Sequence, residues 1–206
     1  RRVPAELAAY PDYQRSVSEA FIDCLSDLHS IDIRRHRLIG LGHPAGFLER
    51  QVRGWSKRWE SARTEEVAEM KLCAEWLTSR MPRSQPATVI HNDFKLDNLL
   101  LDPASPGRVH AVLDWEMATV GDPLVDLGVV LCYWSEARDP HRRREAISPL
   151  TSEPDWYSRS QLMARYQRAT GRDLSGLTYY EVFGLYKLAV VLQQIYHRFR
   201  QGQTHD

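Results

Sequence analysis

The chain has 206 residues, and its 43% hydrophobic content is enough for a packed core and excludes a disordered chain. Its 27 Lys and Arg residues balance its 27 Asp and Glu residues, so no overall charge favours a nucleic-acid partner. Because no apolar run approaches the roughly 20 residues that cross a bilayer, we expect no membrane partner either.

The cysteines and the first residues indicate the redox environment of the protein and how the chain begins. The cysteines are odd in number, far apart and without CxxC spacing: Cys24, Cys73 and Cys132. We therefore expect reduced thiols in a cytoplasmic protein, with neither disulfides nor a zinc site. The chain starts at Arg1 with no Met and no signal-peptide core, which we interpret as a beginning inside a longer polypeptide.

Hydrophobic periodicity predicts a mostly helical chain. In chain order, helices are expected over 13–30, 46–61 and 65–80, from 123 onward, and over 156–170 and 178–200. Capping boxes are expected at Ser16 with Glu19 and at Thr178 with Glu181. The inward face of the last helix is expected to carry Val182, Leu185, Ala189, Leu192 and Phe199.

Short strands are predicted between the third and fourth helices, over 88–90, 98–101 and 109–113. The turn at 102–107 joins the last two as a hairpin.

Other segments are predicted to be turns or loops. Gly40, Gly42 and Gly46 have GxGxxxG spacing and follow no strand, so they indicate a turn and no phosphate-binding loop. The polar, arginine-rich segment 136–155 is expected to be a surface loop.

The residues with the most chemical potential lie in HNDFKLDN at 91–98 and VLDWE at 112–116. Asp93, between two strand candidates, could orient a hydroxyl, although a turn Asp bonded to its own backbone is the commoner situation. Asn98 and Asp114 could give oxygen ligands to Mg²⁺, because paired strands lie about 4.8 Å apart. A solvent-facing carboxylate is the alternative for Asp114, but the combination of all three argues against coincidence.

The residues around this set are expected to support it. His91 is expected to bond backbone groups and fix the loop, in preference to acting as a base. Lys95 could neutralise a transferred phosphate or pair with Asp97. Asp122, followed by Pro, is expected to cap a helix. Asp126 lies on an apolar helix and is costly to bury unpaired, so we expect it to accept hydrogen bonds from loop N–H groups.

The pattern HxDxxxxN, followed by a strand and Asp-Trp-Glu, resembles the aminoglycoside phosphotransferase family, relatives of the protein kinases. More narrowly, HNDFKLDNLL, AVLDWEMATVGDPLVDLG and YYEVFGLYKLAVVLQQIYHRF are similar to the kinase-like domain fused to acyl-CoA dehydrogenases and to its free-standing bacterial relatives. The resemblance implies an α+β, mostly α-helical fold. It would be a kinase-like C-terminal lobe in which a small β-hairpin carries the catalytic and metal-binding loops.

The resemblance also implies transfer of the ATP γ-phosphoryl group to a hydroxyl of a small molecule, with ATP and Mg²⁺ as cofactors. Asp93 would be the catalytic base with Lys95 beside it, and Asn98 and Asp114 would hold the metal and its nucleotide. Asn92 stands where Gly is commoner, and Lys95 where aminoglycoside kinases often carry His. Both departures argue against an aminoglycoside more than against phosphoryl transfer.

Residues 1–206 are expected to form a single domain without the β-rich lobe that holds the nucleotide from its other side. Such a chain alone is expected to bind ATP weakly and to turn over negligibly, because positioning and charge stabilisation are the largest contributions to this chemistry. Apolar surface left exposed by the missing lobe could drive self-association.

The acceptor stays open at this stage. Basic residues at 50–58 and 138–144 would suit an anionic acceptor such as a hydroxyacyl-CoA, although solvated surfaces explain them equally well. An aminoglycoside kinase or a choline- or homoserine-type kinase would share the motif. A non-catalytic, pseudokinase-like binding module is the alternative from another class, and the intact set Asp93, Asn98 and Asp114 argues against it.

Overall fold

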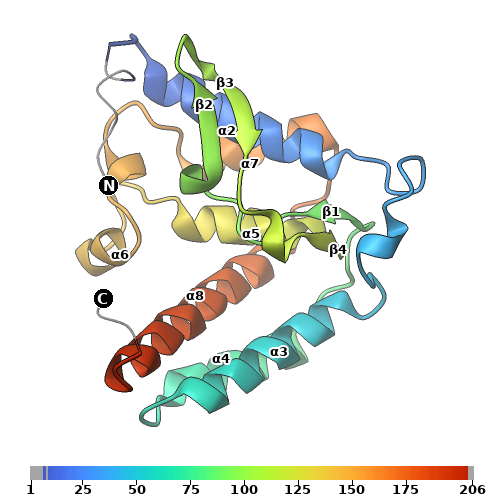
Figure 1. Ribbon diagram of the computed structural model, residues 1–206, viewed down its shortest axis with the longest axis vertical. Helices are drawn as coiled ribbons and strands as arrows, with labels where there is room; N and C mark the ends of the chain where they lie inside the picture. The colour runs from blue at the N-terminus through green and yellow to red at the C-terminus, as the bar shows by residue number, and fades with distance from the viewer. Residues whose placement is uncertain (1–6, 8, 204–206) are drawn as a thin grey trace.

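The computed structural model describes residues 7 and 9–203, and most of them are helical (Figure 1). Residues 1–6, on which the expectation about the start of the chain depends, lie outside the described part. The long helices are α2 (Tyr13–His29), α3 (Phe47–Ala62), α4 (Ala68–Ser79), α5 (Pro123–Tyr133), α7 (Arg159–Thr170) and α8 (Leu177–Arg200). Each corresponds to an expected helix. None of those described is both long and apolar enough to cross a bilayer.

The strands pair as two short antiparallel ladders. One joins β2 (Leu99–Asp102) to β3 (Ser105–Val112), which is the expected hairpin. The other joins β1 (Thr88–Ile90) to β4 (Thr119–Gly121), a strand that the sequence did not predict. The α+β fold class with a small hairpin is confirmed.

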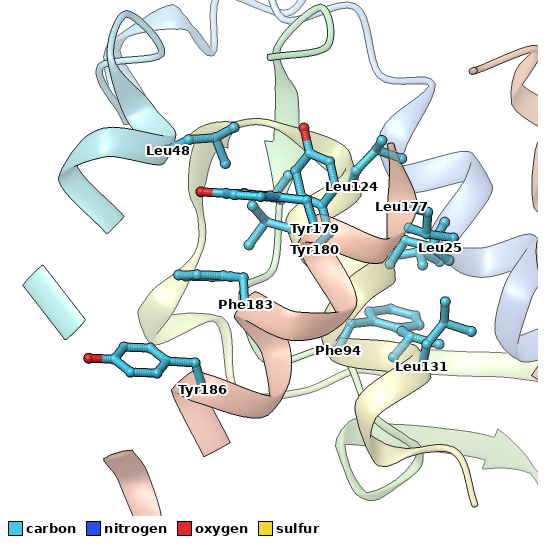
Figure 2. Packing of buried hydrophobic residues seen from close by; sticks show 14 of the residues in the cluster. Leu25, Leu48, Phe94, Leu124, Leu131, Leu177, Tyr179, Tyr180, Phe183 and Tyr186 are labelled. Carbon is cyan, nitrogen blue, oxygen red and sulfur yellow. The ribbon is translucent and has the colours of Figure 1, made fainter. Parts of the chain in front are cut away.

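Helix α5 occupies the middle of the molecule (Figure 1). It is buried from Pro123 to Cys132, as expected for a helix that is apolar all round. Helix α8 packs on α5, α3 packs on α8, and α2 contacts both α7 and β3. Figure 2 shows part of the resulting core, to which Tyr180 and Phe183 of α8 and Leu124 of α5 belong.

Two glycines allow α5 and α8 to approach closely. A Cβ on Gly128 would lie 2.3 Å from the backbone oxygen of Tyr180, and one on Gly184 would lie 2.8 Å from the oxygen of Gly128. Neither position has room for a side chain, because the contacting atoms belong to backbone. Lys187 follows Gly184 by three residues, so it lies one turn beyond this close crossing.

Gly128→Ala is expected to lower the free energy of unfolding by about 2 kcal/mol, because overpacking at a backbone contact outweighs the better helix propensity of Ala. Urea denaturation of the chain would measure it. Gly40→Ala is the control, since nothing lies within 4 Å of a Cβ there. A Gly128→Ala loss no larger than that of the control would mean that the crossing adjusts freely.

Both capping boxes predicted for α2 and α8 are wrong. Helix α2 begins after Asp12, whose backbone oxygen accepts the N–H of Ser16 at 3.1 Å, so Ser16 lies inside the helix. Helix α8 begins after Gly176, which provides no side-chain cap, and Thr178 is already helical. In both cases the helix starts before the residue that resembled a cap. A capping box does form at α7, between Ser158 and Gln161.

The buried face of α8 also differs from the expected one. Leu185, Leu192 and Phe199 are 40%, 46% and 51% exposed. The remaining expected residues, Val182 and Ala189, are half-buried. The helix instead buries Leu177, Tyr179, Tyr180, Phe183, Gly184, Tyr186, Lys187 and Val190. Two apolar stripes with the same helical spacing run along α8, and packing against α5 and α3 selects the second.

Segment 136–155 is not the surface loop that its composition predicted. It contains the short helix α6 (His141–Ala146), and Glu136 and Asp139 are buried. Both carboxylates bind Arg159 at the start of α7: the Arg159 N–H donates to Glu136 at 2.6 Å, and the guanidinium donates to Asp139 at 2.9 Å. The polar composition therefore reflects an ion-pair network that attaches this segment to α7.

Candidate active site

Three of the residues singled out in the sequence meet at the carboxylate of Asp93, on the loop of residues 91–98 between β1 and β2. Lys95 places its Nζ 2.6 Å from Asp93 Oδ2. The side-chain amide of Asn98 donates to the backbone oxygen of Asp93 at 2.8 Å and to its Oδ2 at 3.3 Å. The ion pair of Lys95 is thus with Asp93, where the sequence had suggested phosphate or Asp97. Asp93 keeps a 20% exposed side chain, so it remains accessible to a ligand.

Asp126 of α5 fixes the start of the 91–98 loop through hydrogen bonds. This carboxylate is fully buried, and its two oxygens accept the backbone N–H groups of His91 and Asn92, each at 2.6 Å. Burial of a carboxylate is tolerated here because both oxygens are hydrogen-bonded. Asp122 caps the same helix by accepting the Leu124 N–H at 3.0 Å. The first turn of α5 is therefore fixed by Asp122, and Asp126 within it fixes the loop.

His29 and Tyr166 extend this support, and sequence reasoning missed both. His29 Nε2 lies 3.3 Å from Asp126 Oδ2, and its Nδ1 lies 2.8 Å from the Tyr166 hydroxyl. Burial lowers the pKa of His29, against the opposing effect of Asp126. A neutral ring donates from Nε2 to Asp126 and accepts from Tyr166 at Nδ1. These residues lie on α2 and α7 and carry no motif that could have identified them.

His91 is fully buried and bonds the backbone at both ring nitrogens. Its Nε2 lies 2.8 Å from the Leu113 oxygen, and its Nδ1 accepts the Asp93 N–H at 3.3 Å. The ring therefore connects the 91–98 loop to the end of the hairpin. Neither nitrogen is left over to accept a proton from a substrate.

The hairpin brings Asn98 and Asp114 together. The Leu113 N–H donates to the Asn98 backbone oxygen at 2.8 Å, and Asp114 is the next residue. Asp114 has a left-handed backbone, with φ of 66°. Its exposed carboxylate makes no hydrogen bond or ion pair with the described residues. Since the Asn98 amide nitrogen bonds Asp93, the Asn98 Oδ1 is the atom left to bind a ligand.

This donor set fits Mg²⁺ bound to a nucleotide. Amide and carboxylate oxygens are hard ligands of the type that Mg²⁺ prefers, and Mg²⁺ is usually held by one or two carboxylates plus phosphate oxygens and water. Within residues 7 and 9–203, no group of three or more His, Cys, Asp and Glu side chains could hold a metal on its own. Asn98 and Asp114 offer one amide oxygen and one carboxylate of the hard-donor type.

Asp93 lines a pocket of about 160 Å³, which we call the Asp93 pocket; its lining also includes Lys95, Lys187, Trp55 and Tyr133. The Lys95 ammonium lies 5.5 Å from the Tyr133 ring centroid. A wider pocket of about 540 Å³ adjoins it, because Trp55 and Met117 line both.

The two basic clusters line different pockets. Arg50 and Arg58 of α3 line the wider pocket, and the Arg58 guanidinium lies 4.5 Å from the Trp55 ring centroid. In the 138–144 cluster, Arg138 pairs with Glu136 at 2.6 Å, and Arg143 pairs with Asp139 at 3.6 Å. Arg143 also lines a separate pocket of about 280 Å³, and the Arg50 guanidinium donates to the backbone oxygens of Ala45 and His43. Both clusters therefore combine contacts within the fold with the lining of a pocket, and the α3 cluster lines the pocket that adjoins Asp93.

Comparisons with known proteins identify the arrangement. The model of the phosphotransferase enzyme family (APH) matches residues 1–169. Human Acyl-CoA dehydrogenase family member 11 is 32% identical over 198 residues, which cover 94% of this chain and 25% of that protein. The chain thus spans about a quarter of the length of this relative.

Solved structures show the same fold. A Ralstonia eutropha protein, provisionally named an aminoglycoside phosphotransferase, has a TM-score of 0.84 at 25% identity over 100% of this chain and 63% of that one. The Streptomyces rimosus aminoglycoside phosphotransferase APH(3'')-Id, solved with ADP and streptomycin, has a TM-score of 0.52 at 16% identity over 94% of this chain and 67% of that one. With its kinase-like fold and its 91–98 motif, the chain belongs to the phosphotransferase enzyme family.

Proposed function

We propose that this chain carries the catalytic and acceptor-binding lobe of an Mg²⁺-dependent phosphotransferase, which moves the γ-phosphoryl group of ATP to a hydroxyl of a small molecule. The observation that supports this best is the environment of Asp93. Its carboxylate accepts hydrogen bonds from Lys95 and Asn98 and borders a pocket. The residue before it, Asn92, donates its backbone N–H to Asp126.

Each side chain then has a defined role. Asp93 accepts a hydrogen bond from the acceptor hydroxyl and orients its oxygen towards the phosphoryl group, the task of the aspartate in kinase catalytic loops. Lys95, beside that carboxylate, neutralises charge on the transferred group. Asn98 Oδ1 and the Asp114 carboxylate hold Mg²⁺, which when bound neutralises the phosphate oxygens. His91 and Asp126 keep the loop in place.

The charge around the site favours an anionic acceptor, such as a hydroxyacyl-CoA. Arg50 and Arg58 line the wider pocket next to Asp93. A neighbouring groove of about 640 Å³ between α3 and α8 adds Lys57 and Arg198. A polycationic aminoglycoside would meet like charges here, which costs binding energy. The human relative's name, Acyl-CoA dehydrogenase family member 11, agrees with an acyl-CoA type of acceptor.

Asp114→Ala tests the metal site. In the natural full-length protein, the affinity for Mg²⁺ in the presence of ATP is expected to weaken at least about tenfold, because a carboxylate ligand is lost. Isothermal titration of the nucleotide complex with Mg²⁺ measures it.

Asp155→Ala is the matched control, since Asp155 is also exposed and also left-handed, with φ of 69°. Equal Mg²⁺ affinity in Asp114→Ala and the wild type would remove Asp114 from the metal site. Nucleotide binding without any turnover in the wild type would instead favour a binding module.

A further inference from the structure

Lys187 is a buried cation to which the reaction steps above give no role. It lies on α8 in the apolar run from Leu185 to Val191 and is only 8% exposed. Burying an ammonium is costly unless the charge is paired and hydrogen-bonded. The contacts of Lys187 should therefore indicate why it is there.

Those contacts lead to the residue before Asp93. The Lys187 ammonium donates to the backbone oxygen of Asn92 and lies 5.3 Å from the Trp55 ring centroid. The Asn92 carbonyl belongs to the peptide group that joins Asn92 to Asp93. Lys187 therefore fixes the orientation of the peptide that carries the Asp93 backbone nitrogen.

Asn92 needs such support because its backbone is left-handed, with φ of 65°. A non-glycine residue pays about 1–2 kcal/mol for this conformation, although Asn tolerates it better than most. Three contacts hold it: Asp126 accepts its N–H at 2.6 Å, its side-chain amide donates to the Met117 oxygen at 2.9 Å, and Lys187 binds its carbonyl. The carboxylate of Asp126 on α5 thus binds the N–H of Asn92, and the ammonium of Lys187 on α8 binds its carbonyl.

The close crossing of α5 and α8 makes this possible. Gly128 lies two residues after Asp126, and Gly184 lies three residues before Lys187. Since the glycines bring the two backbones into contact, a carboxylate from one helix and an ammonium from the other reach the same loop.

The electrostatics of the pocket agree with this geometry. Burial lowers the pKa of Lys187, whereas Asp126 and Asp93 raise it and Lys95 and Arg58 lower it. The carboxylates of Asp126 and Asp93 thus oppose the effect of burial on this ammonium. Lys187 also lines the Asp93 pocket, together with Asp93 and Lys95.

We propose that Lys187 is a positioning residue for phosphoryl transfer, which holds the Asn92–Asp93 peptide so that the Asp93 carboxylate faces the Asp93 pocket. This inference rests on the proposed function of Asp93. It extends that function by adding a residue from the last helix, nearly a hundred positions away in the sequence.

Lys187→Met tests it in the full-length protein, because Met has similar length but neither charge nor N–H donors. With Mg-ATP as the probe and water as the acceptor, kcat for hydrolysis is expected to fall about 10²-fold while KM for ATP stays within about twofold. Amide exchange measured by mass spectrometry should become faster in the peptide covering 89–96. Lys71→Met, at an exposed position on α4, is the control and should change neither.

Lys187→Arg keeps the charge with different geometry and should lose only about tenfold in kcat, which provides a folded variant if Met is not tolerated. A kcat for Lys187→Met within about threefold of wild type, or unchanged exchange in 89–96, would overturn the proposal. So would a parallel loss of ATP affinity and faster exchange throughout the chain, which would indicate a purely structural residue. If the wild type shows no Asp93-dependent turnover, the proposed function fails, and the exchange measurement still decides whether Lys187 holds the loop.

Discussion

Replacing Asp93 by Asn is expected to lower kcat for phosphoryl transfer by about 10³-fold in the full-length protein, because general-base contributions span roughly 10²–10⁴-fold. The amide has nearly the same size, but it lacks the charge that orients the hydroxyl and that pairs with Lys95 at 2.6 Å. The Kd for Mg-ATP should stay within about twofold, since Asn98 and Asp114 are untouched.

Steady-state kinetics and nucleotide titration of the same protein preparation measure both quantities. Asp27→Asn, at an exposed position on α2, is the control for a change of one charge elsewhere. Retention of more than about a tenth of the wild-type kcat in Asp93→Asn would show that another group orients the acceptor.

Replacing Asp126 by Ala is expected to lower the free energy of unfolding by about 3–5 kcal/mol, the usual cost of removing one partner from a buried charged network. The change leaves the N–H groups of His91 and Asn92 without an acceptor in a buried site. It also removes a carboxylate that stabilises the ammonium of Lys187. Urea denaturation followed by tryptophan fluorescence measures the loss.

Asp27→Ala provides the comparison for this substitution and should change stability by less than about 0.5 kcal/mol, as surface changes usually do. A cost below about 1 kcal/mol for Asp126→Ala would mean that water or a rearranged loop satisfies the two N–H groups. The loop would then owe its conformation to other contacts.

The proximity of the candidate site residues could be predicted from sequence because most of them are close together along the chain. Asp93, Lys95 and Asn98 lie within six residues, and their contacts follow from one short loop. The hairpin then places Asp114, since its register pairs Leu99 with Val112. Local spacing and one turn were enough to predict that these residues lie close together, but not that Lys95 would pair with Asp93.

Contacts between elements that are distant in the sequence could not be predicted in this way. Strand β4 has three residues, too few for an alternating pattern, and forms only because β1 lies beside it. Helix α8 has two apolar stripes, and only its packing on α5 and α3 decides which is buried. Lys187 did leave a signal, a single cation within an apolar run, but its partner Asn92 is fixed by tertiary structure.

A crystal structure of the full-length protein with Mg²⁺ and a non-hydrolysable ATP analogue would test the central claim most directly. We predict that Asn98 Oδ1 and an Asp114 carboxylate oxygen both lie about 2.0–2.1 Å from one Mg²⁺ ion, with the γ-phosphate between that ion and Asp93. A nucleotide-bound metal with no ligand from either Asn98 or Asp114 would contradict the account.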